Sequence, residues 1–521
     1  MKGKGFTLIE LLAVIVVLAI IMVIATPIVV KTIDDAKKGA FKNTAYGIMK
    51  AAELDYSKKM VKGQKPNEII YEYVDGKEAS GETLEFKGTI PQNGKIVVNR
   101  EGKVALAIHD GTYCAIKAPH KEEVEIAKKK FEDCEVPIPQ YVDKSRANAP
   151  QLITGMTPVI WNGNDWVEPS NINDPYEQDW YDYANQKWAN AKTEDGSFWV
   201  WIPRYAYSIT SGYHTSTAGT IDIKFLNGIT NTTNDGTKIE TSGYETGVKD
   251  TSMHYFKHPA FTFGNDEIEG FWVAKFEPSG TSSNISILPN ATSLRSMTIG
   301  DQFDAAYNMR NNSKYGWNAS DVDTHMMKND EWGAVAYLSK SVYGANAEIW
   351  NNSNNSYKTG CAGSSVSATD EGLCNEYHTS TGQKASTTHN IYGIYDMSGG
   401  AYERVAAYVD NGHGNLSSYG QSILDADLKY KNVYVSSGDT QSGNYTANKN
   451  TFGDAVYETS SSGSDSHSWY SDYSYMPYSV TPWFIRGGYS YNGAAAGVFY
   501  FDNTSGYSYS SSSFRPVLAL P

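Results

Sequence analysis

The chain is poor in positive charge for its length of 521 residues. Lysine and arginine number 44 against 58 aspartates and glutamates, which gives a formal net charge of -14. Proteins that bind nucleic acid independently of its sequence use a stripe of basic side chains, and this sequence has none. We therefore expect no nucleic-acid partner, and a role in DNA uptake is disfavoured.

Common catalytic motifs are missing as well. The sequence contains no glycine-rich phosphate loop and no serine-centred nucleophile elbow. His254 and His258 have the spacing of two metal ligands on a helix, but no glutamate follows in the metalloprotease pattern. These absences predict that the protein is not an enzyme and that it holds no metal or cofactor for catalysis.

Cysteine is scarce, with four residues in the chain. They fall as two local pairs, Cys114 with Cys134 and Cys361 with Cys374, and neither pair has C-x-x-C spacing. This pattern predicts two short-loop disulfides formed in an oxidising location. Four unrelated free thiols in a reducing compartment are the alternative.

One long apolar run stands at the N-terminus. Residues 6–30 contain a single charged side chain, Glu10, and they follow a short basic leader, residues 1–5. A helix of this length spans a bilayer, and the run is too long for an ordinary cleavable secretory signal. A plain membrane anchor is the simpler interpretation. It leaves Glu10 unexplained, because a carboxylate so deep in an apolar helix is costly.

The residues Gly5-Phe6-Thr7-Leu8-Ile9-Glu10 resemble the signal of type IV prepilins. The resemblance implies that a prepilin peptidase cuts after Gly5, that Phe6 is then methylated, and that the subunit assembles with other pilins. The new amine of Phe6 can pair with Glu10 of a neighbouring subunit, since burying both charges together costs less than burying either alone. Pro27 stands where pilins commonly carry a proline that bends the helix.

Residues 31–134 have the pattern of a pilin-like head. Apolar residues recur at roughly helical spacing after Lys31, so we expect the helix from Phe6 to continue to about Lys58. Short β-prone runs separated by Asp-Gly, Asn-Gly and Glu-Gly turns follow. They predict a small antiparallel sheet under the second half of the helix, with strands at 69–73, 83–86, 95–99, 104–109 and 112–117.

Residues 135–165 carry several prolines and little periodicity, which predicts a linker. Residues 166–521 are dense in Trp, Tyr, Gly and Asn and show no repeat of solenoid period. Short strands alternate there with two helical stretches, near 299–310 and 329–338. We therefore predict an α+β domain.

Four segments of this domain resemble the formylglycine-generating-enzyme type of the C-type lectin fold. They are Phe198–Arg204, Gly270–Glu277, Ile391–Arg404, and Arg486–Gly488 followed by Phe514–Pro516. The enzymes of that family use cysteines near the Arg-Gly-Gly segment, but no cysteine follows Cys374 here, so the copper-dependent reaction has no ligand and no nucleophile. Related domains bind calcium, which makes Asp396 and Glu403 calcium candidates. Gly400 replaces a usual Asn, however, and hard cations need several oxygens.

The stretch from Tyr489 to Ser513 has an unusual composition: seven Ser and five Tyr, but no Lys, Glu, Gln, Met or Trp. Every residue type present can be encoded by an AAC codon whose adenines have been replaced, and those five absent types cannot. This is the footprint expected of adenine-directed mutagenesis. A lectin-type domain with such a stretch between Arg-Gly-Gly and Phe-Arg-Pro resembles the variable proteins of diversity-generating retroelements, which display randomised side chains for binding. We call residues 483–516 the variable segment.

Tyrosine provides a large amphipathic contact at low entropic cost, and Ser and Asn provide adaptable hydrogen bonds. The predicted anchors are Tyr489, Tyr491, Tyr500, Tyr507 and Tyr509. The predicted polar contacts are Ser490, Asn492, Asp502, Ser508, Ser510 and Ser512. Residues 469–478 have a similar composition and extend the predicted site. A Ser/Tyr-rich surface loop without a partner is the simpler alternative.

These observations predict a type IV pilin-like adhesin or receptor. It resides in the bacterial cytoplasmic membrane before assembly and at the cell surface or in a pilus afterwards, where its lectin-type domain binds a protein or glycan. Two alternatives remain. One is a structural minor pseudopilin of a secretion or pilus machine, and the other is an oxidoreductase that retains the chemistry of the formylglycine-generating fold.

Overall fold

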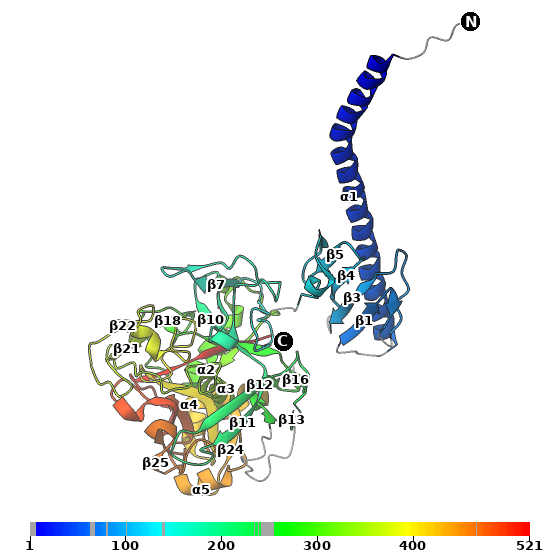
Figure 1. Ribbon diagram of the computed structural model, residues 1–521. Coiled ribbons are helices and arrows are strands. Elements are labelled where there is room, and N and C mark those ends of the chain that lie inside the picture. Colours follow the sequence, from blue (N-terminus) through cyan, green and yellow to red (C-terminus); the bar gives the residue numbers. More distant parts are fainter. Residues whose placement is uncertain are drawn as a thin grey trace. The chain divides into compact units, whose positions relative to one another are not determined.

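The structure of the protein is a computed structural model. It describes residues 7–62, 68–79, 82–99, 102–137, 141–233, 235–237, 239–240, 255–464 and 466–520. The chain divides into two compact units, Met1–Tyr141 and Val142–Pro521. Figure 1 shows the elements of both.

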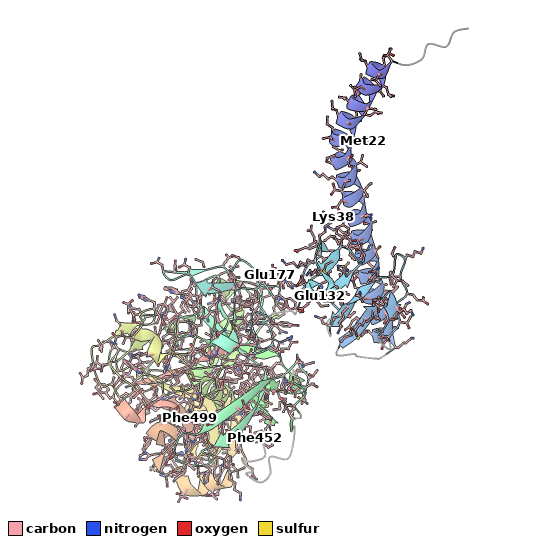
Figure 2. The ribbon with its side chains drawn as sticks, in the orientation of Figure 1. Met22, Lys38, Glu132, Glu177, Phe452 and Phe499 are labelled. Carbon is pink, nitrogen blue, oxygen red and sulfur yellow. A yellow bond between two sulfur atoms is a disulfide. The ribbon has the colours of Figure 1, made fainter. Side chains whose placement is uncertain are left out.

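The first unit is built on one long helix, α1 (Leu8–Val61). Pro27 lies inside the helix, and Figure 1 shows that α1 is curved rather than straight, as expected where proline removes a backbone hydrogen bond. In Figure 2, Met22 lies on the part of α1 that no strand covers, whereas Lys38 lies where the sheet begins. The helix was predicted to end at about Lys58, and α1 ends three residues later, at Val61.

A six-stranded antiparallel sheet covers the second half of α1, in the order β2-β1-β3-β4-β5-β6. Side chains of the helix, including Phe41, Ala45 and Ile48, share one buried core with the sheet. The strands are β1 (Glu68–Val74), β2 (Lys77–Glu78), β3 (Asn93–Asn99), β4 (Val104–His109), β5 (Cys114–Lys117) and β6 (Glu125–Ala127). The head therefore has the helix-on-sheet arrangement that the sequence predicts.

The predicted strand at 83–86 is wrong. These residues form no strand, although Leu84 is buried in the core and Phe86 packs against it. The alternation that suggested a strand comes from this packing. Residues 83–86 contribute to the core through side chains and do not pair with any strand of the sheet.

Two features tie the end of this sheet in place. The disulfide Cys114–Cys134 joins β5 to the segment after β6, which confirms the first predicted pair. Asp34 of α1 forms ion pairs with Lys38 at 3.0 Å and Lys128 at 2.7 Å, and it accepts a hydrogen bond from the Tyr113 hydroxyl. These donors, Lys128 first, hold the pKa of Asp34 well below its usual range. Helix and sheet are thus linked by charge as well as by apolar packing.

The first large sheet of the second unit has the strand order β20-β30-β17-β10-β9-β7-β8. At its centre β10 pairs antiparallel with β17, which places Trp201 opposite Trp272. Both indoles are fully buried. The strands are β7 (Thr157–Trp161), β8 (Trp166–Val167), β9 (Asn190–Lys192), β10 (Phe198–Pro203), β17 (Gly270–Ala274), β20 (Asp323–Met326) and β30 (Pro516–Ala519).

The linker predicted at 135–165 is too long. Residues from Val142 onward belong to the second unit, and β7 is paired with β9 in its sheet. Ile153 and Met156 are buried in the core of that unit. The stretch lacks periodicity because it packs on the core with largely irregular backbone, which a pattern of helix or strand cannot reveal.

The second large sheet has the order β24-β23-β27-β28-β26-β25, with β29 paired to β23. Strands β27, β28 and β29 all come from the variable segment. The strands are β23 (Tyr402–Asp410), β24 (Asn432–Val435), β25 (Ser466–His467), β26 (Tyr473–Ser474), β27 (Trp483–Gly487), β28 (Gly497–Thr504) and β29 (Ser512–Phe514). The variable segment is therefore built into a sheet and is not a loose surface loop.

Four α-helices and several short strands complete the described part of the second unit. Helices α2 (Ile299–Tyr307) and α3 (Asn329–Ser339) confirm the two predicted helical stretches, whereas α4 (Gly414–Asp425) and α5 (Gln441–Ala447) were not predicted. The remaining strands are β11 (Tyr205–Ser211), β12 (Thr220–Phe225), β13 (Ile239–Glu240), β14 (Tyr255–Lys257), β15 (Thr262–Phe263), β16 (Asp266–Glu267), β18 (Ser279–Thr281), β19 (Asn284–Ser286), β21 (Cys361–Ala362) and β22 (Asn375–Glu376). The predicted α+β class is confirmed.

Candidate functional site

The N-terminal site is described only from Thr7 onward, so Gly5 and Phe6 lie outside the described residues. Thr7 caps α1 together with Glu10. The Thr7 backbone N–H and hydroxyl donate to the Glu10 carboxylate at 2.8 and 2.9 Å, and the Glu10 N–H donates to the Thr7 hydroxyl at 3.3 Å. In the subunit alone, therefore, the Glu10 carboxylate accepts the N–H of Thr7, the residue that caps its own helix.

The first half of α1 is a bare apolar surface. Its Leu, Ile, Val and Met side chains up to Val30 are largely exposed. Among the described residues, α1 is the one helix long and apolar enough to cross a membrane. This exposure fits a segment whose surroundings are lipid or neighbouring helices instead of water.

The candidate ligand site lies on the variable segment, where the predicted residues have different exposures. Tyr491, Tyr507 and Tyr509 are 45%, 52% and 46% exposed. Ser510 is exposed as well, and the half-buried members are Tyr489, Asn492, Asp502 and Ser508. These eight residues have the exposure that a contact surface requires.

Three predicted contacts are wrong, because their side chains are buried. Tyr500 on β28 is 1% exposed and donates its hydroxyl proton to Asp502 at 2.9 Å. Ser490 and Ser512 are also buried. Strand β28 is buried on both faces from Gly497 to Phe501, so a Tyr/Ser-rich composition could not show that Tyr500 lies inside. These residues support the site from beneath.

The structure joins seven tyrosines into one continuous chain of ring contacts, which we call the tyrosine row. From one end to the other its members are Tyr491, Tyr489, Tyr402, Tyr500, Tyr473, Tyr475 and Tyr478. Two neighbouring pairs are stacked, Tyr402 on Tyr489 at 4.6 Å and Tyr473 on Tyr475 at 5.8 Å between centroids. Except for the buried Tyr500, all members are half-buried or exposed. The row thus has two groups of solvent-accessible tyrosines, Tyr402 with Tyr489 and Tyr491, and Tyr473 with Tyr475 and Tyr478, which the buried Tyr500 connects.

More than half of this row lies outside the variable segment. Tyr473, Tyr475 and Tyr478 belong to the stretch 469–478, whose composition had suggested an extension of the site, and their ring contacts support that extension. Sequence reasoning missed Tyr402 as a contact. Its place in the Ile391–Arg404 segment gave no signal of exposure, and only the parallel pairing of β23 with β29 places it beside the variable residues.

The loop between β28 and β29 is held through its main chain. Successive carbonyl oxygens accept hydrogen bonds from groups outside the variable segment, so the loop does not depend on its own side chains for these bonds. The donor and acceptor pairs are Ile299 N to Gly506 O, Arg404 to Tyr507 O, Ser296 N to Tyr509 O, Arg295 to Ser510 O, Tyr402 N to Ser511 O and Gln302 Nε2 to Ser512 O.

Arg404 is the central donor of this arrangement. It is fully buried, and its guanidinium also donates to Met297 O at 2.8 Å. Burial lowers the pKa of Arg404 to about 10, so the side chain stays charged at neutral pH. The loop thus presents Tyr507 and Tyr509 on a backbone fixed by a buried cation.

The second predicted disulfide is confirmed and borders the site. Cys361 and Cys374 are bonded, and the loop they close packs against the variable segment, where Thr369 lies beside Gly493. Asn355 donates to Glu371 of that loop at 3.2 Å and to the Tyr491 hydroxyl at 3.3 Å. The disulfide therefore stabilises a polar border at the Tyr491 end of the tyrosine row.

The carboxylates of the two calcium candidates, Asp396 and Glu403, are hydrogen-bonded to other groups of the protein. Asp396 accepts hydrogen bonds from Asn352 and from the N–H groups of Gly360 and Glu277. Both oxygens of Glu403 face the Arg515 guanidinium. Burial raises the pKa of each carboxyl. Because every oxygen of the two already has an N–H donor, this pair does not fit a calcium ion.

The segments that carried the lectin-type resemblance meet in this region. Glu403 pairs with Arg486 in the sheet register and with Arg515 through its side chain. Arg515 also donates to Ala274 O of β17 at 2.7 Å. The residues are thus neighbours in space, although this arrangement does not by itself identify the fold.

A family model described as the prokaryotic N-terminal methylation motif matches residues 1–26. No curated protein matches the chain. The matched stretch contains Gly5, Phe6 and Glu10, so a type IV prepilin-like N-terminus is confirmed. It implies processing by prepilin peptidase and assembly with pilin subunits.

Proposed function

We propose that this type IV pilin-like protein is a surface adhesin or receptor whose second unit, a C-type lectin-type domain, binds a changing ligand through the variable segment. Its pilin-like unit carries that domain from the cytoplasmic membrane to the cell surface or a pilus. The proposed role is binding rather than catalysis, and it needs no cofactor.

The observation that carries the proposal is that the variable segment combines exposed side chains with a backbone held by residues outside the segment. Tyr491, Tyr507 and Tyr509 are exposed, while the loop that holds the latter two is fixed through main-chain carbonyls. Side chains on such a loop can change without loss of these hydrogen bonds. The adenine-replacement footprint of the composition predicts that they do change.

The first test concerns delivery. Intact cells producing the wild-type chain should be labelled by antibodies against the second unit, and Gly5→Leu should abolish processing and surface labelling. A processed and exported Gly5→Leu protein would contradict the prepilin-like route.

The second test concerns diversification. We expect sequencing of the codons for residues 483–516 across a cell population to show substitutions at adenine positions, concentrated in codons for exposed residues. An identical sequence in all cells, together with unchanged adhesion after Tyr491→Ala and Tyr507→Ala, would favour a structural pseudopilin.

A further inference from the structure

Two pairs of rings within the tyrosine row are stacked. The Tyr402–Tyr489 pair is stacked with 27° between planes, and the Tyr473–Tyr475 pair with 14°. Each stacked pair covers one face of both rings. These four side chains are also half-buried, so other parts of the protein cover a further share of each ring.

The charges around the row are few. The stretch Tyr489–Ser513 contains no lysine and no arginine, and Asp502 is its one acidic residue. Burial raises the pKa of Asp502 to about 6. At the borders, Glu371 and Asn355 flank Tyr491, and Gln441 donates to the Tyr475 hydroxyl at 2.5 Å. Within the described residues, the row therefore has an aromatic centre and a polar rim.

From this geometry we propose that the whole tyrosine row is one docking surface for a polypeptide, and that its fixed members bind together with the variable ones. The fixed members are Tyr402, Tyr473, Tyr475 and Tyr478, and the variable members that reach the surface are the half-buried Tyr489 and the exposed Tyr491. The inference rests on the proposed function and adds the class of ligand and the extent of the surface.

A polypeptide fits these groups better than a glycan does. A sugar ring stacks on an open aromatic face, and in the two stacked pairs a neighbouring ring already lies against one face of each tyrosine. Aromatic edges carry partial positive charge and phenol hydroxyls donate hydrogen bonds, so both attract the carbonyl oxygens of a peptide backbone. An aromatic centre with a polar rim is also the usual composition of a protein interface.

The experiment uses the full chain in detergent and two probes, a phage library of random linear peptides and an array of oligosaccharides. The variable pair is changed in Tyr489→Ala/Tyr491→Ala and the fixed pair in Tyr475→Ala/Tyr478→Ala. Tyr457→Ala is the matched control, because Tyr457 is a half-buried tyrosine that stacks on His214 outside the row. Tryptophan fluorescence checks that each variant is folded.

We expect wild type to enrich peptides, and each row variant to lower their affinity by about tenfold or more, with little change in the control. Tyrosine-dependent binding of oligosaccharides instead of peptides would overturn the ligand class. Peptide binding that Tyr475→Ala/Tyr478→Ala leaves unchanged would overturn the extension to fixed residues. If neither probe binds in a tyrosine-dependent way, the proposed function itself fails and this inference falls with it.

Discussion

Arg404 allows the sharpest test of how the loop between β28 and β29 is held. We predict that the single change Arg404→Met destabilises the second unit more than five simultaneous changes in the loop, Tyr507→Ser, Ser508→Asn, Tyr509→Ser, Ser510→Asn and Ser511→Asn. The reason is that Arg404 donates to the loop backbone, whereas those five side chains largely face solvent.

The magnitudes follow from burial. Arg404→Met keeps an apolar side chain of similar length but leaves Met297 O and Tyr507 O without their charged donor. Both hydrogen bonds are part-buried, and one from a charged donor contributes about 1.5–3 kcal/mol, so we expect a loss of roughly 3–5 kcal/mol. Tyr507 and Tyr509 are about half exposed, so each Tyr→Ser change costs about 1 kcal/mol, and surface serines cost little. The five changes together should cost about 2 kcal/mol.

The assay is denaturant unfolding followed by tryptophan fluorescence. All 12 tryptophans lie in the second unit, so their signal reports that unit alone. Binding is measured in parallel with a peptide selected on the wild type. The five-fold loop variant should lose binding and keep most of its stability.

A five-fold variant less stable than Arg404→Met would refute the reasoning, because it would show that the loop is held by its own side chains. Arg404→Lys is the control for charge. It retains the cation but has no planar guanidinium to reach two carbonyls, so an intermediate stability is expected.

Three further predictions concern other parts of the molecule. Glu10→Leu should leave membrane insertion intact and abolish assembly into pilus fractions, because it removes the carboxylate predicted to pair with a neighbour's N-terminal amine; normal pilus yield would contradict that pairing. Asp502→Asn should stabilise the second unit at pH 7.5 by about 1–2 kcal/mol and change its stability little at pH 4. The reason is that the folded-state pKa of Asp502 is raised to about 6, so this carboxyl loses its favourable contribution to stability as pH rises from about 4 through 6. Equal urea midpoints of wild type and variant at both pH values would refute this. Replacing Cys361 and Cys374 by serine should lower the stability of the second unit by about 3 kcal/mol. It should also weaken the protein's binding of peptides that contact Tyr491. Unchanged peptide binding would show that the disulfide loop does not support the site.

The first unit of the protein was largely predictable from its sequence. Helix α1, the methylation motif and the Cys114–Cys134 pair depend on local signals, namely an apolar run, a short motif and a small separation along the chain. The same holds for helices α2 and α3. The strand at 83–86 was mispredicted because Leu84 and Phe86 alternate as in a strand but pack on the core without pairing to the sheet.

The candidate site needed the tertiary structure. Composition alone pointed to the tyrosines of the variable segment, but it could not separate exposed Tyr491 from buried Tyr500, since both stand in the same Tyr/Ser pattern. Tyr402 and Tyr473 join the row through strand pairings between segments far apart in the chain. Such pairings are set by the packing of whole sheets and not by local sequence. The sequence by itself thus determined the long apolar helix, the methylation motif and the composition of the variable segment, while the tertiary structure decided which side chains of the candidate site are exposed.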